Sequence, residues 1–97
     1  MLRDTVQTAL RLSTAAATAL SSEIDRNIKV ARAELIRAGV SVNMAESDDA
    51  LVENAIVAYC LMELGDRSLY DRYHQSWQYQ LDNLRKTAKY NTEGSDS

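Results

Sequence analysis

Few side chains in this sequence belong to the types that build enzyme active sites and metal centres. His74 is the sole histidine and Cys60 the sole cysteine among the 97 residues. A structural zinc site would therefore have to be built almost wholly from carboxylates, which suit zinc poorly. Nucleophilic catalysis by Cys60 would need His74 as its base, and nothing in their spacing supports such a pair. The sequence predicts no metal ligand and no bound cofactor.

Both residues have a simpler structural interpretation. Cys60 lies within an apolar segment, where a cysteine behaves as a small hydrophobic side chain. His74 lies at the edge of an apolar stripe, so we expect it to be a partly exposed structural residue.

A group of carboxylates at Glu46, Asp48 and Asp49 is the remaining candidate for catalysis. General acid–base chemistry needs carboxylates in a cleft with separated pKa values. These three directly precede an expected helix, so capping and the helix dipole explain them better. The three glycines are isolated, which leaves no glycine-rich phosphate loop. We expect no catalytic residue, and we predict that the protein is not an enzyme.

The elements that hold these residues are predicted to be helices. The sequence contains no proline, is 45% hydrophobic and 26% charged, and lacks runs of alternating β-branched residues. A chain of this length supports a single core. Its longest apolar run falls far short of the roughly 18–20 residues that span a bilayer, so we expect no membrane contact. One small all-α domain is predicted.

Apolar side chains at three- and four-residue spacing place these helices at residues 2–12, 21–38, 49–64 and 68–89. The small residues of segment 13–19 are predicted to form a linker whose alanines could extend either neighbouring helix, with Ser21 or Ser22 capping the second helix. Gly39 is expected to end that helix in a left-handed conformation. The third helix is apolar on almost every side, which predicts that it is the central helix or lies partly against another subunit.

These elements predict a small bundle of about four helices with a long C-terminal helix and a flexible polar tail. We expect residues 1–88 to form the helical domain. Residues 89–97 are polar and are predicted to become ordered only when they dock onto a partner.

Several apolar side chains lie outside the predicted buried stripes. Val30 and Ile36 are off the stripe of the second helix, and Tyr79 and Tyr90 are off that of the fourth. Single exposed apolar residues are ordinary, but several of them on so small a domain suggest contacts between subunits. These four are our candidates for a subunit interface.

A DNA-binding role is the alternative that the sequence leaves open. The second helix carries four cations, which are Arg26, Lys29, Arg32 and Arg37. They spread over more than a third of its circumference, and the next helix is too apolar to read DNA. The net charge of −3 and the pI near 5.0 also argue against nucleic-acid binding as the main task. A small cytoplasmic helical regulator that binds protein or DNA is thus the second hypothesis.

The order of segments resembles that of the head–tail connector proteins of tailed phages, also called head-completion or DNA-packaging adaptor proteins. Thr8 to Thr14 is similar to the "ALRxST" start of that family. Further similarities are the Glu23-Ile24-Asp25 segment, the closing Ala38-Gly39-Val40, the apolar segment 49–60, the Gly65-Asp66 turn, the amphipathic segment 70–84 and Tyr90-Asn91. The resemblance covers nearly the whole chain.

This resemblance implies a structural virion protein at the head–tail junction, assembled in the host cytoplasm. Its partners would be copies of itself in a ring (dodecameric on the portal), the portal protein and the tail or a second connector protein. The ring would extend the DNA channel, through which DNA passes without sequence-specific binding. A ring needs two different contact faces on each subunit, which the four interface candidates would provide. Net negative charge also suits such a channel, because cations would retain the phosphates.

Overall fold

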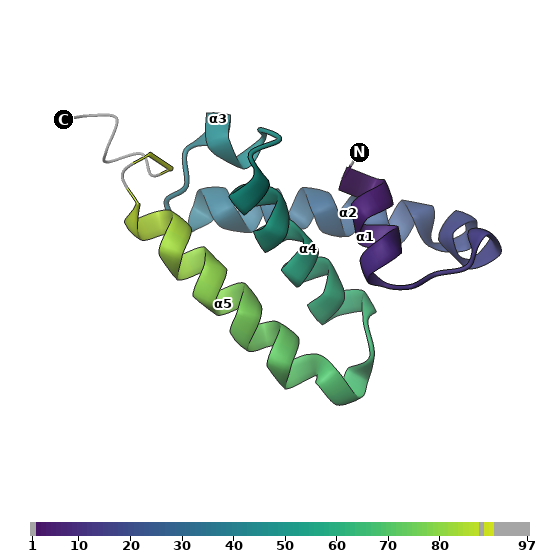
Figure 1. Ribbon diagram of the computed structural model, residues 1–97. Helices are drawn as coiled ribbons and strands as arrows, with labels where there is room; N and C mark the ends of the chain where they lie inside the picture. Colours follow the sequence, from purple (N-terminus) through teal and green to yellow (C-terminus); the bar gives the residue numbers. More distant parts are fainter. Residues whose placement is uncertain (1, 88, 91–97) are drawn as a thin grey trace.

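The computed structural model describes residues 2–87, 89 and 90 (Figure 1). Its elements, in chain order, are α1 (Leu2–Ala9), α2 (Thr14–Arg37), α3 (Val42–Ala45), α4 (Ala50–Leu64), the 3-10 turn η1 (Arg67–Leu69) and α5 (Tyr70–Lys86). No β-strand occurs in this part of the chain. The prediction of a small all-α bundle is therefore confirmed.

Helix α4 is the central helix, as its sequence predicted. It packs against α1, α2 and α5, and its side chains Val52, Ala55 and Ile56 are fully buried. The α4–α5 hairpin is held partly by aromatic packing, with the rings of Tyr59 and Trp77 in an edge contact at 5.0 Å between centroids. A helix that is apolar on nearly all sides requires such neighbours on several sides.

Helix α2 begins well before the predicted position. The Ser13 hydroxyl accepts a hydrogen bond from the Ala16 N–H at 3.2 Å and caps the helix. The expected cap at Ser21 or Ser22 was therefore wrong, and the alanines of segment 13–19 extend the second helix, which is one of the two possibilities that the sequence left open. The physical reason is the alanine content of this stretch, because alanine has the highest helix propensity and extends α2 by two turns.

Two helix ends use left-handed residues. Gly39 has φ of 113°, and the Val40 N–H donates to the Leu35 carbonyl at 2.9 Å, so the predicted glycine stop is confirmed. Val40 and Leu35 are both fully buried, which fixes the direction in which the chain leaves α2. Helix α1 ends in the same way at Arg11, with φ of 57°, which is earlier than the predicted end at residue 12.

The connection between α2 and α4 contains a short helix that the sequence pattern did not predict. The Ser41 hydroxyl caps α3 by accepting the Met44 N–H at 3.3 Å. The Arg32 guanidinium then donates to the Ala45 carbonyl at 2.6 Å, which satisfies the C-terminal end of α3 and ties it to α2.

The last helix is shorter than expected, since α5 runs from Tyr70 to Lys86.

The chain after α5 returns to the bundle. Tyr90 is only 4% exposed, and its carbonyl accepts the Ser41 N–H at 2.6 Å. The prediction of a flexible tail from residue 89 was therefore wrong for Lys89 and Tyr90, because the Tyr90 ring finds an apolar site beside α3 and α4. For residues 91–97 the tail prediction lies outside the described residues.

Candidate functional site

Cys60 and His74, the two residues that could have taken part in catalysis, do not form one site. Cys60 is fully buried in α4, and burial, assisted by the Glu63 carboxylate, raises the pKa of its thiol to about 12. His74 is exposed on α5, where its ring stacks on that of Tyr70 at 5.9 Å between centroids. The two side chains do not form a nucleophile–base pair. Within residues 2–87, 89 and 90, no group of three or more His, Cys, Asp or Glu side chains could hold a metal ion.

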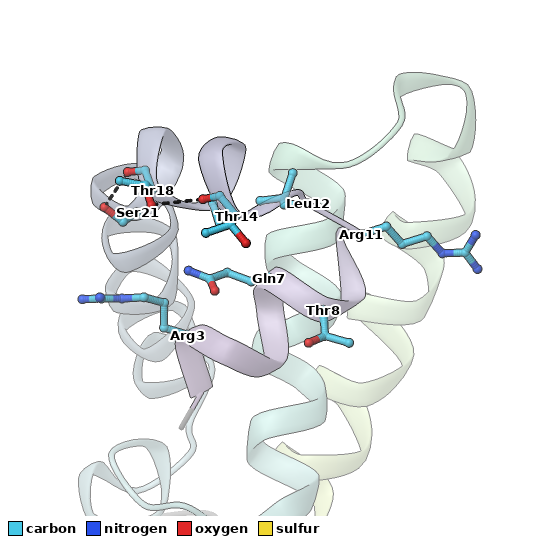
Figure 2. A pocket seen from close by; sticks show the side chains of 9 residues that line it. Arg3, Gln7, Thr8, Arg11, Leu12, Thr14, Thr18 and Ser21 are labelled. Atoms are coloured by element: carbon cyan, nitrogen blue, oxygen red, sulfur yellow. Dashed lines mark hydrogen bonds between the residues drawn. The ribbon is translucent and has the colours of Figure 1, made fainter.

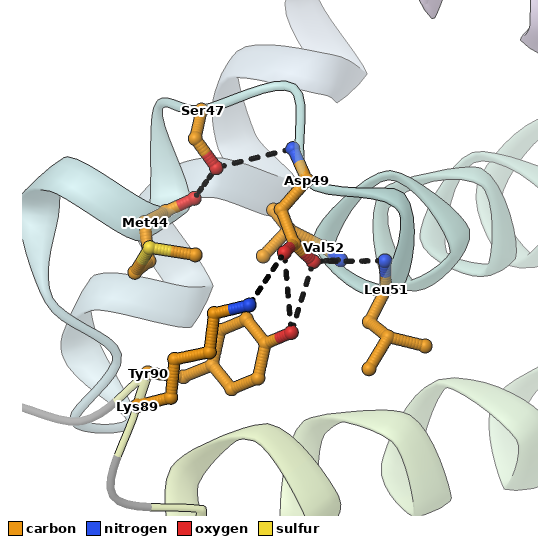
Figure 3. Close-up of polar contacts among 7 residues, drawn as sticks. All are labelled: Met44, Ser47, Asp49, Leu51, Val52, Lys89 and Tyr90. Carbon is orange, nitrogen blue, oxygen red and sulfur yellow. Dashed lines mark hydrogen bonds and ion pairs between the residues drawn. The ribbon is translucent and has the colours of Figure 1, made fainter.

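Of the three acidic residues before α4, Asp49 has a structural role. Figure 3 shows Lys89 and Tyr90 converging on Asp49, which caps α4. The Asp49 carboxylate accepts the Leu51 N–H at 2.9 Å and the Val52 N–H at 3.3 Å, as well as the Tyr90 hydroxyl at 3.1 Å. Partial removal from water raises its pKa, but these hydrogen bonds and the Lys89 charge outweigh that effect and leave the pKa below its ordinary value. The expected capping role of Asp49 is confirmed.

A cavity of about 670 Å³ lies between α1 and the first turns of α2 (Figure 2). Three of the polar side chains that line it have partners within the fold. The Arg3 guanidinium binds the Asp25 carboxylate at 2.8 Å, and the hydroxyls of Thr18 and Ser21 donate to backbone carbonyls of α2. Arg3 and Arg11 point away from one another in Figure 2. The cavity therefore lacks the convergent donors that define a ligand site.

A more apolar groove follows the α4–α5 hairpin. It consists of two cavities of about 410 and 400 Å³ that share Leu61 and Tyr73. The first is lined by Ala9, Leu10, Arg11, Leu61, Gly65, Asp66, Leu69 and Tyr73. The second is lined by Asn54, Val57, Ala58, Leu61, Tyr73, Ser76, Tyr79 and Gln80. We call this the α4–α5 groove; its lining mixes apolar and polar side chains, as protein contact surfaces do.

The four predicted interface residues fall into three environments. Tyr79, at the α4–α5 groove, is 69% exposed, and Val30 on α2 is 37% exposed. Ile36 is half-buried and packs against the core. Tyr90 belongs to the core, so its assignment to an exposed surface was wrong; its ring is covered by the same chain. Only Val30 and Tyr79 remain as exposed apolar candidates from that prediction.

Two further exposed apolar residues were missed by the sequence reasoning. Val42 at the start of α3 is 57% exposed, and Leu51 at the start of α4 is 55% exposed. Val42 was assigned to a connection, and Leu51 was assigned to a helix expected to be covered on all sides. The serine before Val42 is the signal that could have indicated a capped turn with an outward-facing first residue.

The four cations of α2 do not form one basic surface. Arg32 binds the carbonyls of Ala45 and Ser47, and Arg37 pairs with Glu34 at 2.9 Å. Arg26 and Lys29 are exposed and make no ion pair within the described part of the chain. Arg32 thus ties two elements of the fold together, whereas Arg37 makes an exposed ion pair within its own helix.

None of the helices in the described residues has the length and apolar character that crossing a bilayer requires. Comparison of the sequence and structure with models of protein families, with curated proteins and with solved structures found no match.

Proposed function

We propose that this chain is a structural virion protein, a head–tail connector that forms a ring beneath the portal of a tailed phage. The ring would extend the DNA channel and provide the platform on which the tail or a second connector docks. The proposal rests on the resemblance of segment order and on one structural observation. That observation is the exposure of apolar side chains on different helices of one small domain.

Two of these exposed side chains belong to different helices. Val30 projects from α2, whereas Tyr79 borders the α4–α5 groove, and α4 packs between these two helices. A subunit of a ring makes heterologous contacts, so it needs two non-identical surfaces for its neighbours and further surface for the proteins above and below. Val30 and Tyr79 would lie at the two contacts with neighbouring subunits.

The chemistry of the chain is consistent with a structural role. The thiol of Cys60 is inaccessible, and the Asp49 carboxylate is occupied by backbone donors and Tyr90. In the described part of the chain, the exposed charged groups do not gather around the cavities as a catalytic constellation would require.

The test is assembly on portal rings encoded in the same genome. The variants Val30→Asp and Tyr79→Asp place a charge on each exposed surface, and Gln75→Asp is the matched control on an exposed part of α5 outside the groove. All three should keep the helicity of the wild type by circular dichroism. The first two should lose binding to the portal, whereas Gln75→Asp should bind as the wild type does.

Assembly that survives both substitutions would refute this assignment of surfaces. A chain that does not bind the portal but shifts the mobility of duplex DNA at low salt would instead favour the hypothesis of a helical regulator.

A further inference from the structure

Helix α2 ends in a Schellman motif, in which two N–H groups beyond the helix donate back to carbonyls of its last turn. The Val40 N–H donates to the Leu35 carbonyl at 2.9 Å. The Gly39 N–H donates to the Ile36 carbonyl at 3.0 Å. The motif needs one residue with a positive φ, and Gly39 adopts φ of 113° without strain because it has no Cβ.

Helix α1 ends in the same motif, but an arginine occupies the left-handed position. The Leu12 N–H donates to the Gln7 carbonyl at 3.3 Å, and the Arg11 N–H donates to the Thr8 carbonyl at 3.0 Å. Arg11 has φ of 57° and is the one residue other than glycine with a positive φ in the described part of the chain. A residue with a Cβ is strained in this conformation. The turn from α1 to α2 is therefore strained, whereas the equivalent turn after α2 is not.

Helix α1 is also weakly anchored to the bundle. It has 8 residues, which is too few for a helix that is stable in isolation. An ion pair between Arg3 and Asp25 connects it to α2, but both side chains are about half exposed, so water screens their attraction. Its two buried side chains are Leu2 and Val6. The packing of these two side chains is therefore the main contact that holds α1 in place.

The other helices are joined to one another by contacts that do not involve α1. Helix α4 packs against both α2 and α5 (Figure 1), and the rings of Tyr59 and Trp77 meet between α4 and α5. The Tyr90 hydroxyl binds the Asp49 carboxylate and fastens the segment after α5 to the start of α4. All of these contacts remain when α1 leaves its position.

We propose that α1 is a lid that opens as one unit about Arg11, while α2, α4 and α5 stay folded. Opening releases the backbone strain at Arg11 and exposes Leu2 and Val6, together with the surfaces of α2 and α4 against which α1 packs. Closing hides the same apolar surface again. The lid is a conformational device of the fold itself, and it does not depend on the proposed connector function.

Native-state hydrogen exchange of the full chain, followed for each amide by NMR, tests the lid. The hydrogen-bonded amides of α1 and of its C-terminal turn should share one protection factor, at least about tenfold below that of the buried amides of α4. Their exchange should also depend less on guanidinium, because opening α1 exposes less surface than global unfolding does. Fraying from the N-terminus would instead give protection that rises gradually along α1.

Two substitutions at one exposed position separate backbone strain from side-chain contacts. Arg11→Ala removes the side chain but keeps the strained Cβ, whereas Arg11→Gly removes both. The protection of α1 should therefore be about fivefold higher in Arg11→Gly than in Arg11→Ala. The control is Ala33→Gly, at an exposed position inside α2, which should lower protection in α4 by about fivefold because glycine weakens a helix interior. It should leave the protection of α1 unchanged, since α2 stays folded when the lid opens.

Four results would overturn the proposal. The first two are protection of α1 equal to that of α4 and protection graded along α1. The third is equal protection of α1 in Arg11→Gly and Arg11→Ala, which would show that Arg11 is not the strained hinge. The fourth is a loss of protection in α1 that matches the loss in α4 for Ala33→Gly, because α1 would then open only by global unfolding. None of these measurements involves the portal, so the lid and the connector function stand or fall separately.

Discussion

The hydroxyl of Tyr90 donates to both oxygens of the Asp49 carboxylate, at 3.1 and 3.2 Å, across 41 residues of sequence. The same carboxylate caps α4 through the N–H groups of Leu51 and Val52. The segment that follows α5 is thereby fastened to the start of the central helix. This contact makes the end of the described chain part of the bundle rather than a free extension.

Truncation of the Tyr90 ring should destabilise the protein. Tyr90→Ala should lower the free energy of unfolding by about 3 kcal/mol, because it removes a buried aromatic side chain. Tyr90→Phe should retain most of that stability, since it loses only the hydroxyl. Denaturant unfolding measures both, and Tyr79→Ala is the control, with an expected change within about 0.5 kcal/mol because Tyr79 is exposed. Equal losses for Tyr79→Ala and Tyr90→Ala would contradict the docked position of Tyr90.

Acid should weaken the same contact. The pKa of Asp49 lies below its ordinary value in the folded chain, because hydrogen bonds from Val52, Tyr90 and Leu51 and the Lys89 charge outweigh partial removal from water, which raises it. Its contribution to stability is therefore complete above the unfolded pKa of about 3.9 and is lost as the pH falls through the lower folded value. Asp49→Asn keeps a good capping residue but cannot titrate.

Stability measured between pH 6 and pH 2 should therefore fall less steeply for Asp49→Asn than for the wild type. Parallel pH curves for the two proteins would show that Asp49 does not couple folding to proton binding.

Substitutions of two serines test where α2 begins. Ser13→Ala should lower the free energy of unfolding by about 1 kcal/mol, because the Ala16 N–H loses its acceptor. Ser22→Ala lies inside the helix at an exposed position and should leave stability unchanged or slightly raised, since alanine is the better helix former. Thermal unfolding followed by circular dichroism measures both. A larger loss of stability for Ser22→Ala than for Ser13→Ala would indicate that α2 begins at Ser21 or Ser22, as the sequence pattern predicted.

Cys60 should be unreactive in the folded protein. Burial and the neighbouring Glu63 raise its pKa to about 12, so very little thiolate exists at pH 8, and the thiol is inaccessible. Alkylation by iodoacetamide at pH 8 should be at least about a hundredfold slower in the folded chain than in the chain unfolded by guanidinium. Similar rates in the two states would show that α4 is not the enclosed central helix.

The sequence was sufficient to predict the elements whose signals are local and periodic. Asp49 and Gly39 mark helix ends by side-chain capping and left-handed geometry, and α4 is so apolar that a central position follows from its composition. The start of α2 was misplaced because alanine-rich sequence has no apolar periodicity, although its helix propensity is high. Short α3 was missed because a single turn has too few residues for a periodic pattern.

The interface candidates depended on tertiary packing, which local patterns do not contain. Tyr90 is off the stripe of α5 yet is buried, because the chain turns back after Lys86 and reaches Asp49. Val42 and Leu51, each near the start of a helix, are exposed although both are apolar. Predicting either result requires knowledge of how distant segments meet.

The central claim is that this chain forms a connector ring on a portal, and electron microscopy of the two purified proteins tests it most directly. Negative-stain images of portal mixed with an excess of the chain should show an added ring of density at one end of the portal. Portals that remain bare at saturating concentrations of the folded chain would contradict the account.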